Sequence, residues 1–346
     1  MSADRAADIR SLLAGMGYAD FVADPAPPRG RNLIWTGYST SAGGAPRRLF
    51  AKRLTGAVAD TAERFSRALH FAEFAGFGDN SLAARTPALV ASEEGARLLI
   101  YDYRSGPSAF ELPVDDELCR ECGQLIALLH SRDLTAGISA SPLARPALDE
   151  FRALPLRSYL GASGGELAMW RLLQQDTALI SAIAALLALE DDAPRVPAHC
   201  DLRLDQFRRD EEGLYLTDWE EFRAADPARD VGSLAGDIVY QALCGALSGK
   251  AGAGDLGQRL DSAFGRARGH VSAMWESYLA SVDVDPTGLA ERAGRFAGWH
   301  LIDRTLALTQ ISGRLPAKGK VMLGVGQMLL LSGSEAGARV GLDRSA

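Results

Sequence analysis

The chain has 346 residues, of which 47% are hydrophobic and 23% charged, and its formal net charge at pH 7 is −7. This is enough for one large domain or two lobes with a sizeable core. The negative charge argues against general nucleic-acid binding, which needs a basic face. No run of about 18 apolar residues predicts a membrane span. No apolar signal region follows residues 1–5, so a cytoplasmic protein is expected.

The first hundred residues alternate between helical and strand patterns. Apolar residues recur at helical spacing near the start, and a stretch rich in Pro and Gly follows. The predicted elements are then a helix at 6–16, strands at 32–38 and 48–54 that form a hairpin, a helix at 60–74, and strands at 86–91 and 97–103. A hairpin, a helix and two further strands form a small mixed lobe.

Strand patterns become scarce after a linker at 104–113. Helices are predicted at 115–131, 146–158, 165–189, 230–248, 255–280, 286–312 and about 317–332. The exception is a short strand pair within 201–219. The last residues, 333–346, are small and charged, and they are expected to be loose.

The four cysteines are expected to be reduced thiols, because no export signal accompanies them. Cys119 and Cys122 form a C-x-x-C within a helical pattern. No second Cys pair or nearby His pair completes a zinc site. We therefore interpret them as two cysteines one helical turn apart.

The most specific pattern runs from His199 to Gln206 and continues, after a short hairpin, to Asp218-Trp219-Glu220. It places two carboxylates and an amide, those of Asp201, Gln206 and Asp218, on two adjacent loops. One carboxylate can deprotonate an attacking hydroxyl, while an amide and a second carboxylate can hold magnesium against nucleotide phosphates. The set therefore indicates phosphoryl transfer.

These residues resemble the signature of the aminoglycoside phosphotransferase and choline kinase-like family, H-x-D-x-x-x-x-N followed by a strand ending in D-x-E. The match extends to Asp226-Pro227-Ala228-Arg229-Asp230, which is similar to G-D-P-x-x-D in the family. The resemblance implies that Asp201 is the catalytic residue and that Gln206 and Asp218 bind Mg²⁺. The family usually has Asn where this chain has Gln206, whose amide oxygen lies one methylene further out.

The resemblance implies an α+β, bilobal protein-kinase-like fold with an antiparallel N-lobe sheet plus helix and a larger, mostly helical C-lobe. The nucleotide would bind between the lobes. The expected parts are a nucleotide-binding N-lobe at 1–103, a hinge at 104–113, a C-lobe with the catalytic loop and acceptor site at 114–332, and a flexible tail at 333–346.

Lys52 lies in the middle of a predicted strand among apolar residues. A buried Lys needs an anionic partner, and the resemblance implies that this partner is the α/β-phosphates of ATP; a solvent-facing Lys on an edge strand is the alternative. The family's helix Glu, which would pair with Lys52, should fall at Ala68 and is absent. Glu63 and Glu73 are the alternatives on that helix.

Further contacts with the nucleotide are expected before the hairpin and at the end of the last N-lobe strand. The turn Gly30-Arg31-Asn32 resembles the family's phosphate-covering turn, although a Gly after two prolines is also an ordinary turn. Adenine is expected to contact the backbone near Tyr101 and Tyr103, unless this segment is simply a buried strand.

Several residues near the signature have expected supporting roles. The resemblance implies that His199 and Asp230 brace the catalytic loop, and that His130 ends the first C-lobe helix in a structural role. Arg203 can stabilise the charge on the transferred phosphate or pair with a carboxylate. Asp205 and Glu220 are nearby acids that can share the metal or the substrate.

The sequence thus predicts an enzyme that uses ATP and Mg²⁺, with Asp201 and Arg203 as its catalytic residues. The acceptor is a hydroxyl of a natural product, such as an antibiotic, or of Ser or Thr in a biosynthetic precursor peptide. The loop is also similar to stand-alone kinases of lanthipeptide and thioamitide biosynthesis, and a peptide acceptor would require a partner lyase or cyclase. The alternatives are a pseudokinase that scaffolds a biosynthetic complex, motivated by Gln206 and the missing helix Glu, and a plain helical binding protein.

Overall fold

The computed structural model describes residues 9, 11–24, 31–40, 46–78, 80–135, 137–139, 147–248, 255–283, 285–310 and 312–343. The chain divides into two units. The N-terminal unit comprises Met1–Pro107, Thr135–Ile138 and Arg208–Phe222, and the helical unit comprises Ser108–Leu134, Ser139–Phe207 and Arg223–Ala346. Gly30, a predicted nucleotide-binding residue, lies outside the described residues.

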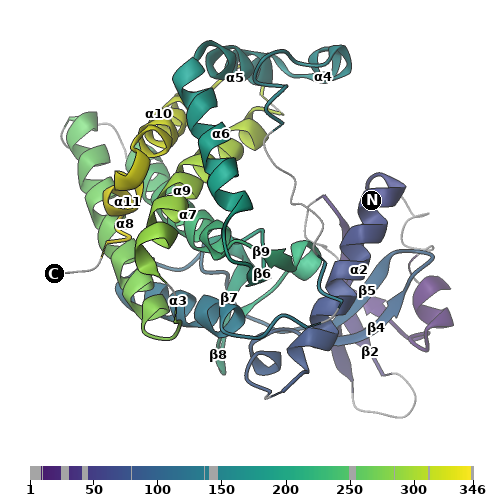
Figure 1. Cartoon of the computed structure of the whole chain (residues 1–346). Coiled ribbons are helices and arrows are strands. Elements are labelled where there is room, and N and C mark those ends of the chain that lie inside the picture. The colour runs from purple at the N-terminus through teal and green to yellow at the C-terminus, as the bar shows by residue number, and fades with distance from the viewer. Residues whose placement is uncertain are drawn as a thin grey trace. The chain divides into compact units, whose positions relative to one another are not determined.

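The N-terminal unit is built on a five-stranded antiparallel sheet with the order β1-β2-β3-β5-β4 (Figure 1). Its strands are β1 (Val22–Ala23), β2 (Leu33–Ser39), β3 (Arg47–Arg53), β4 (Leu89–Glu93) and β5 (Leu98–Asp102). The predicted hairpin and the two later strands are present, with slightly different bounds, and β1 is an addition that the sequence did not predict.

Side-chain alternation along β3 separates the two faces of this sheet. Leu49 and Ala51 pack into a cluster with Trp35 and Ile100. The opposite face is covered by helix α2 (Val58–Ala75), which contributes Phe65 and Ala68 to a second cluster. Because Lys52 alternates with Ala51, it lies on the face that α2 covers, which is where its charge needs partners.

Residues 208–222 also belong to the N-terminal unit, and aromatic residues pack them against α2. The segment contains the hairpin of β7 (Phe207–Asp210) and β8 (Gly213–Leu216) and the short 3-10 helix η4 (Trp219–Glu221). The Trp219 ring stacks on Phe71 of α2, with centroids 3.5 Å apart and 7° between the planes. Residues 208–222, assigned to the C-lobe from the sequence, therefore group with the N-terminal unit.

The helical unit consists mainly of packed helices (Figure 1). They are α3 (Asp116–His130), α4 (Leu156–Gly161), α5 (Gly164–Gln175), α6 (Thr177–Asp191), α7 (Pro227–Ser248), α8 (Leu256–Leu279), α9 (Pro286–Thr309), α10 (Ala317–Leu331) and α11 (Ala336–Val340). Helix α9 packs against both α7 and α10. A Cβ at Gly298 of α9 would lie 2.7 Å from the Gly326 carbonyl oxygen of α10, so these helices approach as closely as glycine allows.

Two predictions about these helices differ from the structure. The helix expected at 165–189 is two helices, because the Asp176 side chain accepts the Leu179 N–H at 2.9 Å and caps a new helix, α6. The helix expected at 146–158 is replaced by turns over 148–152 and the short helix α4.

The residues after 332 were expected to be loose from their composition. Within the described part, residues 333–343 instead form a 3-10 turn and α11, which packs against α9. Val340 and Leu342 are buried. Their apolar side chains supply the contacts that fix this segment.

Among the helices that the structure describes, none is long and apolar enough by itself to span a membrane. The pair α5 and α6 reaches that length and composition only when both helices are taken together across an 84° bend.

Candidate active site

The predicted catalytic loop lies in the helical unit, between the strand β6 (Val196–Ala198) and the 3-10 helix η3 (Leu204–Gln206). The strand β6 pairs with β9 (Arg223–Ala225), which leads directly into α7. In the first turn of α7, the Asp230 carboxylate accepts hydrogen bonds from the backbone N–H groups of His199 and Cys200, each at 2.7 Å. The prediction that Asp230 braces the loop agrees with this geometry.

The backbone at Cys200 has a left-handed conformation, with φ of 67°. This is an uncommon conformation for a residue with a Cβ. It is held here because two successive N–H groups must converge on one carboxylate. It also brings the Asp201 N–H to 3.3 Å from Nδ1 of the buried His199, which supports a structural role for that histidine.

Asp230 is fully buried and also contacts a histidine at the end of α3. His130, at the end of α3, contacts Asp230 through Nε2 at 3.2 Å and the Tyr278 hydroxyl through Nδ1 at 3.0 Å. Burial alone would raise the pKa of Asp230, but the hydrogen bond and charge of His130, together with the N–H of His199, outweigh it and hold the pKa below its usual range. The carboxylate therefore remains ionised and keeps the loop in place.

A second carboxylate of α7 fixes the other side of the loop, and the sequence analysis missed it. Asp237 accepts the Leu204 N–H at 2.9 Å and contacts His300 Nε2 at 3.1 Å. Asp230 and Asp237 are seven residues apart, about two helical turns, and therefore lie on one face of α7. An acid at this spacing within an otherwise apolar helix was the signal that would have revealed it.

The catalytic candidates Asp201 and Arg203 contact each other. The Arg203 Nη1 donates to both carboxylate oxygens of Asp201, at 2.9 and 3.2 Å, and its Nε donates to Asp205 at 3.0 Å. The Asp201 side chain is 37% exposed. A carboxylate that is fixed through its backbone and still open to solvent can accept a proton from a bound hydroxyl.

Gln206 ends η3 and is buried, and its backbone N–H donates to the Arg203 carbonyl at 3.0 Å. It belongs to the helical unit, whereas the other predicted metal ligand, Asp218, belongs to the N-terminal unit. Metal binding by Gln206 stays a prediction.

In the N-terminal unit, Lys52 is buried and forms ion pairs with Asp218 and with Glu220, the latter at 3.1 Å. Burial alone would lower the pKa of Lys52, but the charges of Asp218 and Glu220 outweigh it and raise the pKa. The ammonium group therefore stays charged although it is buried. The alternative of a solvent-facing Lys on an edge strand is wrong, because β3 lies between β2 and β5.

Neither helix Glu considered from the sequence is the partner of Lys52. Glu63 is 66% exposed and pairs with Arg67, and Glu73 is exposed on α2. Ala68, where the family pattern places the Glu, is buried in the apolar cluster between α2 and the sheet. The partner is Glu220, two residues after Asp218.

The two described residues of the predicted phosphate-covering turn are engaged by neighbouring side chains. Arg31 donates to Asp60 at 2.6 Å. The Asn32 amide donates to Glu220 at 3.2 Å and accepts the Thr55 N–H, also at 3.2 Å. Asn32 thus joins the cluster around Lys52, and nucleotide contact by either residue stays a prediction.

In the segment predicted to bind adenine, one backbone donor is already engaged. The N–H of Tyr103 donates to the Arg48 carbonyl at 3.0 Å, and the Arg48 guanidinium lies 4.0 Å from the centre of the Tyr103 ring. Tyr101 packs against the apolar cluster beneath α2. Burial, followed by the charges of Asp218 and Glu220, raises the pKa of Tyr101. Contact of these tyrosines with a base stays a prediction.

The carboxylates beside Lys52 have the chemistry that Mg²⁺ requires. Asp218 and Glu220 provide hard oxygen donors in one unit, and Asp218 is presented by a left-handed backbone with φ of 71°. Within the described residues, no group of three or more His, Cys, Asp or Glu side chains is arranged to hold a metal. Magnesium usually uses one or two carboxylates and completes its shell with phosphates and water.

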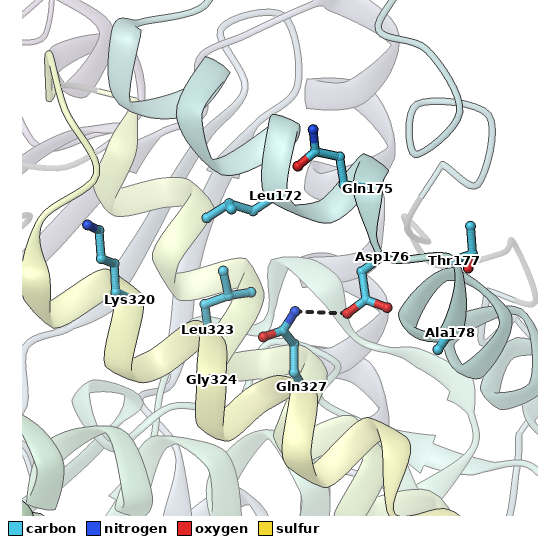
Figure 2. Close-up of a pocket in the computed structure, with 9 residues that line it drawn as sticks. All are labelled: Leu172, Gln175, Asp176, Thr177, Ala178, Lys320, Leu323, Gly324 and Gln327. Carbon is cyan, nitrogen blue, oxygen red and sulfur yellow. Dashed lines mark hydrogen bonds between the residues drawn. The ribbon is translucent and has the colours of Figure 1, made fainter.

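A separate pocket of about 690 Å³ lies in the helical unit, between the junction of α5 and α6 and one face of α10 (Figure 2). Its carboxylate, Asp176, already accepts the Gln327 amide at 3.0 Å and caps α6. None of the predicted site residues lines this pocket.

The sequence pattern of the phosphotransferase enzyme family matches residues 37–271, which is more than half of the chain. The chain belongs to this family. The matched residues of this phosphotransferase include Lys52, the catalytic loop, Asp218 and all of α7. No curated protein sequence matches the chain.

Solved structures of kinases share the fold of this phosphotransferase. The ethanolamine kinase of Plasmodium vivax has a TM-score of 0.57 at 12% identity, over 92% of this chain and 86% of that chain. The choline kinase of Streptococcus pneumoniae has a TM-score of 0.55 at 13% identity, over 95% and 99%. A spectinomycin phosphotransferase in complex with ADP and spectinomycin has a TM-score of 0.51 at 13% identity, over 95% and 98%. The predicted protein-kinase-like α+β fold and the phosphotransferase class are confirmed.

Proposed function

We propose that this phosphotransferase moves the γ-phosphate of ATP to a hydroxyl of a small molecule, with Asp201 as the catalytic base. The observation that carries the proposal is the catalytic loop. Its backbone is held from one face of α7 by two buried carboxylates, while the Asp201 carboxylate stays 37% exposed. Such a loop keeps a proton acceptor in one position without covering it, as general-base catalysis requires.

The proposed reaction transfers one phosphoryl group from ATP to the acceptor. The acceptor oxygen forms a bond to the γ-phosphorus as the bond from that phosphorus to the β–γ bridging oxygen breaks, and ADP leaves. The hydroxyl proton passes to Asp201. Arg203, which pairs with Asp201, offers its guanidinium to the charge on the transferred phosphoryl group.

Lys52 is proposed to contact the α- and β-phosphates of ATP. Its ammonium group is held by two carboxylates and is buried, so a phosphate that reaches it meets a charge in a fixed position. Asp218 and Gln206 would hold Mg²⁺, which supplies charge neutralisation at the phosphates.

The acceptor class rests on the family. The similar structures include kinases named for choline and ethanolamine and a phosphotransferase named for spectinomycin, all of which are small molecules with hydroxyl groups. A precursor peptide with Ser or Thr, together with a partner lyase or cyclase, is the narrower alternative. The cytoplasmic location also stays a prediction.

A pseudokinase is the rival proposal, and one of its two motives is now weaker. The absent helix Glu suggested that Lys52 lacks a partner, yet Glu220 pairs with it. The remaining motive is Gln206 in place of Asn.

The test is a turnover assay with ATP and Mg²⁺ against a panel that contains choline, ethanolamine, aminoglycosides, macrolides and Ser-containing peptides. The release of ADP is measured for the wild type and for Asp201→Ala, and phosphorylated products are identified by mass. Acceptor-dependent ADP release that the variant lacks supports the proposal. ATP that binds but is never turned over with any acceptor favours the pseudokinase.

A further inference from the structure

The two carboxylates that pair with Lys52 come from residues 218–220 and not from α2. At the position where the family pattern has a helix Glu, α2 carries Ala68, which is buried in an apolar cluster with Leu54, Phe65 and Leu99. Glu220 of η4 approaches Lys52 instead, with 3.1 Å between its Oε2 and the Lys52 Nζ. A Lys–Glu pair is therefore present, but its glutamate lies on η4 instead of on α2.

The Glu220 carboxylate is 12% exposed and contacts donors from three segments of the chain. Besides Lys52 of β3, it accepts from Arg64 Nη2 at 3.1 Å and from Asn32 Nδ2 at 3.2 Å. Three donors that converge on one nearly buried carboxylate fix its orientation.

Helix α2 provides Arg64, a cation that binds Glu220, whereas the family pattern has an acid on this helix. Its side chain is fully buried, and it is tied down by the Asn32 Oδ1 at 2.6 Å, the Thr55 carbonyl at 3.2 Å and Asp60 at 3.1 Å. A buried guanidinium with this many acceptors cannot be replaced without loss of its partners' hydrogen bonds.

The backbone of η4 is also bound to α2. Arg67 Nε donates to the Glu220 carbonyl at 2.8 Å, and the Trp219 ring stacks on Phe71. The Trp219 Nε1 donates to Thr86 at 2.8 Å. Helix α2 thus holds the segment that bears the carboxylate as well as the carboxylate itself.

We infer that Glu220 positions Lys52 in place of the missing helix carboxylate, and that Arg64 positions Glu220; this rests on the proposed role of Lys52 at the phosphates. Two cations share Glu220, so its charge is divided between them. If Asp218 were to hold Mg²⁺, Glu220 would remain as a partner that fixes the position of Lys52 without neutralising its charge fully. The Lys52 ammonium then remains attractive to phosphate.

The test compares Glu220→Gln with the matched control Glu221→Gln. Glu221 is the next residue of η4, and it pairs with Arg67 at 3.1 Å instead of with Lys52. The dissociation constant of Mg-ATP, the kcat and the KM for ATP are measured for both variants and for Lys52→Met. The double variant Lys52→Met/Glu220→Gln completes a double-mutant cycle. Arg64→Met is measured in the same way, and Arg64→Lys, which keeps a cation at this position, replaces it if Arg64→Met does not fold.

We expect Glu220→Gln to lower kcat/KM for ATP by about 10²-fold, because Lys52 would no longer be held in position for the phosphates. The kcat/KM of Glu221→Gln should stay within about twofold of the wild type. The double variant should be no worse than Lys52→Met alone, because both changes remove one contact to phosphate. Equal effects of Glu220→Gln and Glu221→Gln, or effects of Lys52→Met and Glu220→Gln that multiply, would overturn the inference alone. A wild type that neither binds nor turns over ATP would overturn the proposed function, and the inference with it.

Discussion

At the scale of single residues, Asp230 links the catalytic loop to α3 and α7. It accepts two backbone N–H groups and contacts His130, and its pKa lies below the ordinary value of 3.8. A carboxyl whose pKa is lowered by folding stabilises the protein above its unfolded pKa. It loses this contribution as the pH falls through the lower, folded pKa.

Replacement of Asp230 by Asn should therefore lower the free energy of unfolding by about 3–5 kcal/mol at pH 7, because the charged partner of His130 and of two N–H groups is lost. The difference from the wild type should shrink as the pH falls below 3.8. Urea unfolding between pH 3 and 7 measures both. A difference that stays constant down to pH 3 would mean that the Asp230 charge does not hold the loop.

Cys200 has a left-handed backbone in the same loop, and this conformation costs a residue with a Cβ about 1–2 kcal/mol. Glycine adopts it without that cost. Cys200→Gly should keep the free energy of unfolding unchanged or raise it by about 1 kcal/mol, with turnover retained, whereas the β-branched Cys200→Val should lower both. A clear loss of stability in Cys200→Gly would show that the thiol stabilises the loop more than the turn strains it.

At the scale of elements, the N-terminal unit depends on close contact between residues 104–107 and the β7–β8 hairpin. Arg104 Nε donates to Asp210 at 2.7 Å, and the Tyr215 hydroxyl donates to the Arg104 carbonyl at 2.9 Å. Between them, Gly106 has φ of 119°, and a Cβ there would lie 1.8 Å from the Arg209 carbonyl oxygen.

Two glycine variants separate this close contact from backbone strain. Gly137 has a similar φ of 101°, but no atom lies within 4 Å of the place of its Cβ. Gly137→Ala should lower the free energy of unfolding by about 1–3 kcal/mol through strain alone. Gly106→Ala should lower it by more, because the backbone of β7 must also move. Equal thermal midpoints for the two variants would contradict this view of the hairpin contact.

Some of the helices, strands and loops could be predicted from the sequence, and others could not. Lys52 sits on a strand and Asp201 on a loop, as local patterns predicted, because periodicity and motif spacing are properties of neighbouring residues. The helix break at Asp176 was missed because an Asp within a helical pattern is ordinary until its side chain caps a new helix. The ordered residues 333–343 depend on packing against α9, which is far away in sequence.

At the scale of the whole molecule, the resemblance of a few motif residues to a known family implied the family and the fold, and the comparisons confirm both. The hydrogen-bond and ion-pair partners of those residues could not be predicted from the sequence. Glu220 was expected only as a nearby acid that can share a metal or the substrate, and Asp237 was not singled out. Both roles come from hydrogen bonds between elements distant in sequence. Local patterns therefore predict candidate site residues, while their partners depend on tertiary contacts.

We propose that Asp201 performs the chemistry while Lys52 and Asp218 hold the nucleotide. The most direct measurement is the dissociation constant of Mg-ATP, beside the turnover rate with an accepted substrate, for Asp201→Asn, Lys52→Met and Asp218→Asn. We expect Asp201→Asn to bind Mg-ATP as the wild type does and to lose turnover by about 10²–10⁴-fold, while the other two variants lose binding. Turnover by Asp201→Asn at the wild-type rate would contradict the account.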